Sequence, residues 1–409
     1  MKLLFVHQNF PGQYRHLAAH YAAIPTNTVV AVREARPGRP LNGKGIRLLE
    51  YEQPKAANAS THHYLRETEA CVRRGQMVVR SLVPLRREGF QPDVICVHPA
   101  WGEGLFLKDV FPDARVLSFW EFYYTGADSD FDPEWRPTAD QRFHTRVRNA
   151  TQLMSFAVTD WGVSPTRWQQ SQYPPPWRAL ISVIHDGVDT KLVRPNPKAV
   201  VRLEHPPLQL TKQDEVVTYV ARNLEPYRGF HVFMRALPEL LRRRKKVQVL
   251  VVGGDEVSYG RKPEDGLTWR QKLLAEVGTE LDASRVHFLG KVPYALLLQI
   301  YQISSAHVYL TYPFVLSWSM LEAMASGCVV IGSRTPPVEE VITDEVNGLM
   351  VDFFSTDQIV EKICRVLEDP AAMVPLRHRA RQAIVDRYAL HRVCLPQQLS
   401  LIGTLASRW

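Results

Sequence analysis

Short apolar runs recur along the chain, and each ends at a turn before a stretch whose apolar residues have helical spacing. A run of this length and composition is typical of a buried strand. Strands that alternate with helices predict a parallel, doubly wound α/β sheet. The strands expected in the first half of the chain are Leu3–Val6, Thr28–Val32, Asp93–Val97, Arg115–Phe119, Phe156–Val163 and Ser182–Ile184.

A second series of such runs follows a turn-rich segment near Asp186–Asp214, which contains Asp186-Gly187 and four prolines. Its expected strands are Val216–Val220, Val247–Val252, Val286–Leu289, His307–Leu310 and Val329–Ile331. The 409 residues therefore predict two Rossmann-like domains, at 1–190 and 191–385, with a C-terminal helix in 386–409. That helix is expected either to pack on the second domain or to cross back to the first. We expect the two domains to face each other, with a ligand cleft between them at the carboxyl ends of the strands.

Composition narrows the class of protein. The chain is 45% hydrophobic and 22% charged, which indicates a globular protein. It lacks the run of about 18 apolar residues that a membrane span needs. The five scattered cysteines form no Cys-x-x-Cys pair, so a reducing cytoplasm is the expected location. The net charge of +8 favours an anionic partner, but no zinc-finger, heptad or RNA-binding signature points to nucleic acid.

An acid stands alone in the apolar segment Pro313–Gly327. Ser317 is a suitable N-cap for a helix from Trp318 to Ser326 that Gly327 ends, and this helix follows the strand His307–Leu310. The free N–H groups at its start, near Ser319, predict a site for an anion such as diphosphate. Glu322 lies one turn further, where its carboxylate can accept hydrogen bonds from sugar hydroxyls. A carboxylate on the solvated face of the helix is the alternative.

Two arginines lie near the expected end of another strand. Arg222 and Arg228 follow Val216–Val220, in a loop that Pro226 and Gly229 shape. The planar guanidinium fork suits phosphate, so we expect both to stabilise a diphosphate leaving group. Surface arginines without a ligand are the alternative.

The first domain offers three further candidates at strand ends. Gly12 follows the first strand and lets a ligand approach the backbone, His98 ends Asp93–Val97, and Glu121 follows Arg115–Phe119. Structural roles for these residues stay open. The chain has neither a Gly-x-Gly-x-x-Gly fingerprint nor a phosphate-binding Gly-x-x-x-x-Gly-Lys loop, which argues against a dinucleotide dehydrogenase.

A predicted helix from Thr61 to about Leu82 carries a basic stripe, formed by Arg66, Arg73, Arg74 and Arg80. Such a stripe can contact anionic lipid, which would make the protein peripheral at the inner membrane face. A solvated helix face is the alternative.

Several segments, in this order along nearly the whole chain, resemble the family-4 glycosyltransferases, which are retaining nucleotide-sugar transferases with the GT-B fold. The matching segments are His185–Asp189, Ala221–Gly229, Val249–Gly254, Val286–Pro293, Leu321–Val330 and Asn347–Val351. The resemblance implies an NDP-sugar donor held mainly by the second domain and a glycan, lipid-linked or small-molecule acceptor held by the first.

The resemblance also implies residue roles. Arg222 and Arg228 match the basic pair that binds the diphosphate, and Glu322 matches the second acid of the family's Glu-x7-Glu motif, which holds the ribose. Further donor contacts are implied at Ser317, Trp318, Ser319, Gly253, Val292 and Gly12. His98 is expected to assist catalysis, with Glu121 on the acceptor side.

Phe314 is the departure from the family pattern, because it stands where the first acid contacts the donor sugar. Front-face attack requires no protein nucleophile, so we expect activity without that acid and without a metal or other cofactor. The alternatives are a non-catalytic relative that binds the NDP-sugar and an NDP-sugar epimerase of the same fold.

Overall fold

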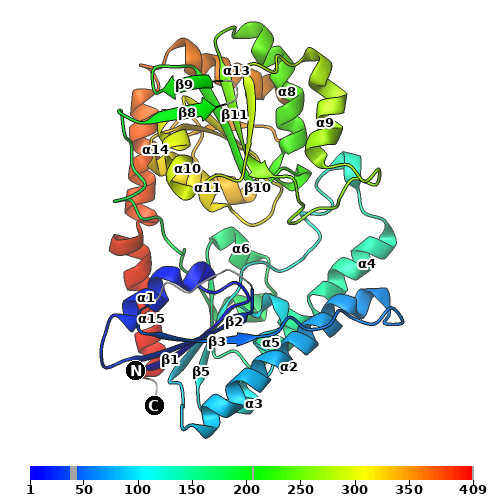
Figure 1. Cartoon of the computed structure of the whole chain (residues 1–409), viewed down its shortest axis with the longest axis vertical. Coiled ribbons are helices and arrows are strands. Elements are labelled where there is room, and N and C mark those ends of the chain that lie inside the picture. The colour runs from blue at the N-terminus through cyan, green and yellow to red at the C-terminus, as the bar shows by residue number, and fades with distance from the viewer. Residues whose placement is uncertain (37–43, 205–206, 408–409) are drawn as a thin grey trace. The chain divides into compact units, whose positions relative to one another are not determined.

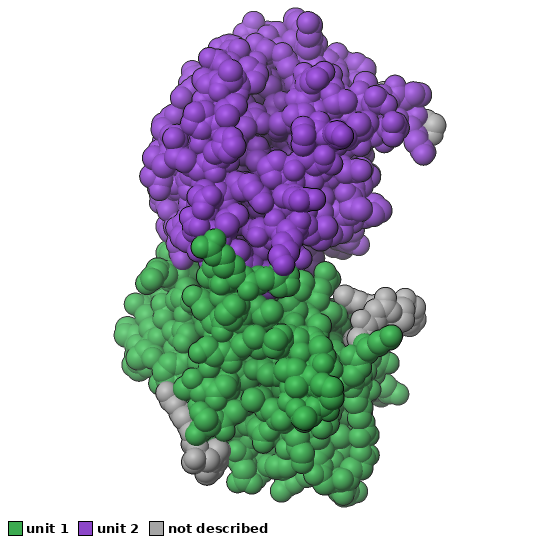
Figure 2. All heavy atoms as spheres, turned by 90° about the vertical axis from the view of Figure 1, so that its left-hand side faces the viewer, with its two compact units in different colours: residues 1–187, 391–409 green, residues 188–390 purple. Residues whose placement is uncertain are grey.

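The computed structural model describes residues 1–36, 44–204 and 207–407. Two compact units divide the chain, one formed by Met1–Gly187 together with the chain from His391 onward, the other by Val188–Leu390 (Figure 2). Each unit has its own sheet and its own hydrophobic core. No helix among the described residues is long and apolar enough to cross a membrane.

Unit 1 is built on a parallel sheet of seven strands in the order β3-β2-β1-β4-β5-β6-β7. Figure 1 labels β1, β2, β3 and β5 of this sheet. Its strands are β1 (Lys2–Val6), β2 (Thr28–Glu34), β3 (Ile46–Tyr51), β4 (Val94–Val97), β5 (Arg115–Phe119), β6 (Trp161–Ser164) and β7 (Ile181–Val183). Its helices are α1 (Arg15–Ala22), α2 (Arg66–Arg87), α3 (Leu107–Val110), α4 (Ala139–Arg148), α5 (Ala150–Phe156), α6 (Arg167–Ser171), α7 (Pro175–Arg178) and α15 (Leu395–Ala406).

Unit 2 contains a parallel sheet of six strands in the order β12-β11-β10-β13-β14-β15. These are β10 (Val216–Asn223), β11 (Gln248–Gly254), β12 (Val286–Gly290), β13 (Ala306–Tyr309), β14 (Val329–Ser333) and β15 (Leu349–Val351). The helices are α8 (Phe230–Arg243), α9 (Trp269–Val277), α10 (Tyr294–Ile303), α11 (Trp318–Ala325), α12 (Pro336–Glu339), α13 (Thr356–Glu368) and α14 (Val374–Arg387). The doubly wound α/β class predicted from the sequence is confirmed in both units.

Two predicted stretches differ from the structure, and two strands were not predicted. The strand expected at Phe156–Val163 is wrong at its start, because α5 continues to Phe156 and β6 begins only at Trp161. Asp160 makes the turn between them, and its Oδ2 accepts a hydrogen bond of 2.8 Å from the backbone N–H of Val116. Within the predicted linker, β8 (Val200–Glu204) and β9 (Pro207–Thr211) form an antiparallel hairpin. The edge strands β3 and β15 were not predicted.

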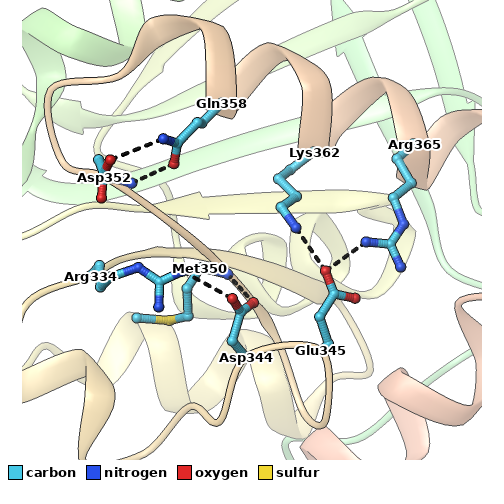
Figure 3. Close-up of polar contacts among 8 residues, drawn as sticks. All are labelled: Arg334, Asp344, Glu345, Met350, Asp352, Gln358, Lys362 and Arg365. Carbon is cyan, nitrogen blue, oxygen red and sulfur yellow. Dashed lines mark hydrogen bonds and ion pairs between the residues drawn. The ribbon is translucent and has the colours of Figure 1, made fainter.

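The turn before β15 is fixed by side chains, as Figure 3 shows. Asp344 accepts a hydrogen bond of 2.8 Å from the backbone N–H of Met350 and pairs with Arg334 at 3.0 Å. Glu345 has a positive φ of 61°, which is uncommon for a residue with a side chain. Its carboxylate forms ion pairs with Lys362 at 2.7 Å and Arg365 at 2.6 Å, both of which lie on α13. The segment Asn347–Val351 thus has a structural role, because these contacts fix the turn that leads into β15.

Candidate functional site

Arg228 is a buried cation in the turn between β10 and α8, with only 6% of its surface exposed. Its Nη1 donates to the hydroxyls of Tyr309 at 3.3 Å and Thr311 at 2.8 Å, and to the backbone oxygen of Val315 at 2.8 Å. All three acceptors are neutral, and among the described residues Arg228 forms no ion pair with a carboxylate. A buried cation with no carboxylate within ion-pair distance is suited to receive an anionic ligand.

Tyr309 connects Arg228 to the start of α11. Its hydroxyl also accepts a hydrogen bond of 2.8 Å from the backbone N–H of Ser317. The Ser317 side chain caps α11 by accepting from the N–H of Ser319 at 3.3 Å, and the Ser319 hydroxyl donates to it at 2.9 Å. The helix predicted to begin at Trp318 is therefore confirmed, and the structure brings Arg228 close to the helix start.

Arg222 has a different environment from Arg228. It lies within β10 rather than after it, beside an irregularity in the pairing with β11, and its side chain is exposed. Among the described residues its guanidinium forms no hydrogen bond or ion pair. Lys291, and more weakly Arg222, lower the pKa of the Glu256 carboxyl. The two arginines predicted as a pair therefore differ in burial, and only Arg228 is held in place.

Glu322 is partly buried on α11. Its Oε1 accepts a hydrogen bond of 2.7 Å from the hydroxyl of Tyr294, the first residue of α10. Burial raises the pKa of Glu322, and the Tyr294 hydrogen bond opposes this rise. An ionised carboxylate has about four acceptor sites, so one hydrogen bond leaves capacity for ligand hydroxyls. Tyr294 was not predicted from the sequence.

Phe314 is buried among aromatic rings. Only 4% of it is exposed, and its ring centroid lies 5.4 Å from that of Tyr227 and 5.0 Å from that of Tyr259. The Arg228 guanidinium carbon lies 5.9 Å from the Phe314 ring centroid. The surroundings of Arg228 are therefore aromatic on this side.

Gly253 and Val292 both have packing roles in unit 2. A Cβ at Gly253, in β11, would lie 2.7 Å from Leu224 Cδ2 and 2.9 Å from the backbone oxygen of Ala221. Val292 packs against the hydrophobic core. Their predicted contacts with a donor stay predictions.

In unit 1, polar side chains meet beyond the carboxyl ends of β1, β4 and β5. Gln13 Oε1 lies 2.7 Å from Nε2 of His7, and its Nε2 donates to Glu121 Oε1 at 3.3 Å. His98 Nε2 lies 3.6 Å from Glu121 Oε2. The structure thus brings together His98 and Glu121, which were predicted separately at two strand ends. His7 and Gln13 were missed, although His7 directly follows the first apolar run.

His98 is completely buried, and its ring stacks on Trp101 with a centroid distance of 4.2 Å. Neither of its ring nitrogens has a hydrogen-bond partner among the described residues. Gly12 has a φ of +44°, and a Cβ there would lie 2.6 Å from His7 Nε2. Glycine at position 12 therefore permits the close approach of His7 to the backbone.

The predicted basic stripe on α2 needs a correction at Arg74. Its Nη1 donates to the backbone oxygen of Trp101 at 2.7 Å, and its Nε lies 3.5 Å from Glu34 and 3.8 Å from Glu103. Arg73 pairs with Glu69 on the same helix. The remaining members of the stripe, Arg66 and Arg80, are exposed.

Glu103, which lies near Arg74, is buried, with 1% of its surface exposed. Its Oε1 accepts a hydrogen bond of 2.9 Å from the Tyr51 hydroxyl, whereas Oε2 has no partner among the described residues. Burial raises the pKa of Glu103 to about 7, against the opposing charge of Arg74. Across the part of the chain that the structure describes, no group of three or more His, Cys, Asp or Glu is arranged to hold a metal ion.

Known families match both units. The Glycosyl transferase family 4 group matches residues 25–193, and the Glycosyl transferases group 1 matches residues 201–386. Together, these two glycosyltransferase family models cover most of the chain. A D-inositol 3-phosphate glycosyltransferase of Nocardia farcinica is 30% identical over 195 residues, which are 47% of this chain and 41% of that protein. That of Corynebacterium urealyticum is 24% identical over 358 residues, or 85% of this chain and 80% of that protein.

The match to the first of these relatives spans less than half of its length. Among solved structures, sucrose-phosphate synthase from Thermosynechococcus elongatus gives a TM-score of 0.76 at 18% identity, with 99% of both chains covered. Anabaena HepE, solved in complex with UDP and glucose, gives a TM-score of 0.70 at 15% identity and the same coverage. These likenesses confirm the GT-B fold class.

Proposed function

We propose that the protein is a glycosyltransferase that moves a sugar from an NDP-sugar to a hydroxyl group of a saccharide, lipid-linked or natural-product acceptor. Arg228 carries the proposal, because it is a buried cation that only neutral protein oxygens bind. The start of α11, linked to it through Tyr309, adds N–H groups and the positive end of a helix dipole. Together these groups stabilise the negative charge that develops on a departing diphosphate.

The proposed reaction retains the configuration of the sugar. The bond between the anomeric carbon and the diphosphate oxygen breaks, and the acceptor oxygen bonds to that carbon on the same face. The acceptor proton passes to the leaving diphosphate, so the step requires no protein nucleophile. The positive charges of Arg228 and Arg222 oppose the diphosphate charge, and the proposal includes no metal.

The remaining donor and acceptor roles are assigned within each unit. In unit 2, Glu322 accepts hydrogen bonds from the donor ribose through the oxygen that Tyr294 leaves available. We favour a uridine nucleotide, since HepE was solved with UDP and glucose. In unit 1, His98 and Glu121 orient the acceptor hydroxyl near His7 and Gln13.

A donor screen that measures released nucleoside diphosphate tests this function. We expect release from at least one UDP- or GDP-sugar, and a loss of about 100-fold or more in kcat/KM for Arg228→Ala, since one electrostatic donor to a developing anion is worth that much. Glu322→Ala should mainly raise KM for the donor. Arg228→Lys keeps the charge and should recover part of kcat, which separates the charge effect from a folding defect.

Glu280→Gln is the matched control, because Glu280 is exposed in unit 2 outside the site. Thermal unfolding of every variant shows whether it is folded. Equal activity of wild type, Arg228→Ala and Glu322→Ala would refute the proposed roles. Tight NDP-sugar binding without turnover on any acceptor would instead favour a non-catalytic relative, the second candidate, which Phe314 in place of a sugar-binding acid suggests.

A further inference from the structure

Glu225 is a fully buried carboxylate near Arg228 that the proposed reaction does not use. Its Oε1 accepts a hydrogen bond of 3.0 Å from the backbone N–H of Ser258. Its Oε2 accepts from the N–H groups of Tyr259 at 3.1 Å and Gly260 at 2.8 Å. A single carboxylate thus binds three consecutive backbone donors of the segment that follows β11.

Two other contacts hold the same turn. The side-chain amide of Asn223, at the end of β10, lies 2.7 Å from the hydroxyl of Ser258. At Gly260 a Cβ would lie 3.2 Å from Tyr227 Cδ2 and 3.3 Å from Glu225 Oε2, so glycine allows the close approach. The Asn223 side chain and the glycine at position 260 therefore help to keep the turn close to Glu225.

Tyr259 is the residue whose side chain this turn directs toward Arg228. Its ring centroid lies 5.2 Å from the guanidinium carbon of Arg228 and 5.0 Å from the Phe314 ring centroid. A guanidinium within about 6 Å of an aromatic face is attracted to it. Tyr259 is partly exposed, whereas Phe314 is buried, so Tyr259 is the ring that a ligand approaching Arg228 can touch.

The other role that Glu225 could fill is that of counter-ion to Arg228. It forms no ion pair with Arg228 within 4.0 Å among the described residues, and its three hydrogen bonds all go to the turn. Charge-assisted hydrogen bonds to backbone N–H groups are strong and directional. Through these hydrogen bonds, the Glu225 carboxylate holds the turn that carries Tyr259.

We propose that Glu225 is a positioning residue, which holds the turn Ser258–Gly260 so that Tyr259 forms one wall of the diphosphate-sugar pocket at Arg228. This inference rests on the proposed function, since it assigns a wall to the same donor site. The aromatic ring of Tyr259 contacts the donor next to the diphosphate and adds no negative charge there.

A double-mutant cycle on Glu225→Gln and Tyr259→Ala tests the coupling. Titration calorimetry with UDP measures Kd for wild type, both single variants and the double variant. We expect each single change to weaken binding about tenfold, in line with the loss of a charged hydrogen-bond set. Because both changes remove the same wall, the double variant should stay close to either single variant rather than reach about 100-fold.

Glu280→Gln, at an exposed residue of unit 2 outside the site, controls for the loss of a negative charge and should bind UDP as wild type does. Additive effects in the cycle, or wild-type binding by Glu225→Gln, would overturn the inference. If GDP rather than UDP binds the wild type, the cycle is run with GDP.

Failure of wild type to bind either nucleotide would refute the proposed function itself, which is a separate result. If Glu225→Gln does not fold, Asn223→Ala releases the same turn at Ser258 and replaces it in the cycle. In that cycle, additivity again overturns the inference and shared loss supports it.

Discussion

At the scale of single residues, two buried ionisable side chains, Arg228 and Glu103, differ in how the cost of their burial can be compensated. Arg228 donates hydrogen bonds to the neutral oxygens of Tyr309, Thr311 and Val315. Glu103 lies near Arg74 and accepts from Tyr51, yet burial raises its pKa to about 7. A charged group that is buried without full compensation lowers stability in its charged form. For Arg228 a ligand can supply the compensation, whereas Glu103 can bind a proton.

Glu103 therefore predicts a pH dependence of stability. Its pKa is raised from 4.5 to about 7, so the folded state binds the proton more tightly and stability falls as pH rises across that window. The effect is about 3 kcal/mol, at 1.36 kcal/mol per pKa unit. Glu103→Gln should thus be more stable than wild type at pH 8 and show no such gain at pH 4.5, measured by urea unfolding. Glu52→Gln, an exposed change after β3, is the control. An equal difference at both pH values would contradict the prediction.

At the scale of elements, the sequence predicted those strands whose signal is local. The strands β1, β4 and β5 are uninterrupted buried runs and lie where they were expected. By contrast, β3 has mostly partly exposed or exposed residues at the edge of the sheet, so its sequence lacks a buried run. Phe156 looked like part of a strand because an apolar residue at a helix end and one in a strand are alike without their tertiary partners.

The candidate site shows the same division. The Ser317 cap could be predicted because capping depends on residues a few positions apart. Glu225 could not, since its three donors lie 33 to 35 residues away along the chain. Tyr294 contacts Glu322 from a different helix, 28 residues distant. Contacts between elements far apart in sequence leave no periodic signal in a single sequence.

The helix α2 gives an element-scale prediction about membranes. Arg74 pairs with Glu34 and Glu103 and so is not available to lipid. Arg66 and Arg80, by contrast, are exposed. Each basic residue near an anionic surface contributes about 1 kcal/mol. We expect vesicles with anionic lipid to retain the protein at low salt, and Arg66→Glu with Arg80→Glu to abolish this retention in a sedimentation assay. Lys198→Glu, a charge reversal at an exposed residue of unit 2, should leave it unchanged. Retention of the double variant at the wild-type level would show that the stripe is only solvated.

At the scale of the whole molecule, the chain leaves unit 1 after Gly187 and contributes to it again from His391. The returning segment is held by burial, because Cys394, Ile402 and Leu405 are each at most 3% exposed. Leu401 and Ile402 lie beside Leu17, Leu117 and Phe119 in a small apolar cavity of about 30 Å³. The core of unit 1 is thus completed by the last helix of the chain.

Removal of residues 391–409 should therefore weaken unit 1 selectively. Each fully buried aliphatic side chain contributes about 1.5–3 kcal/mol, so the loss of α15 removes several kcal/mol from this core. Hydrogen exchange should accelerate in β4 and β5, which α15 contacts, and in β1, which pairs with β4. In unit 2, β10, β11 and β13 should keep their protection, because their core is formed within Val188–Leu390. A chain that lacks only residues 407–409 keeps all of α15 and should exchange as wild type does. Faster exchange in β10, β11 and β13 than in β1, β4 and β5 would contradict the assignment of the last helix to unit 1.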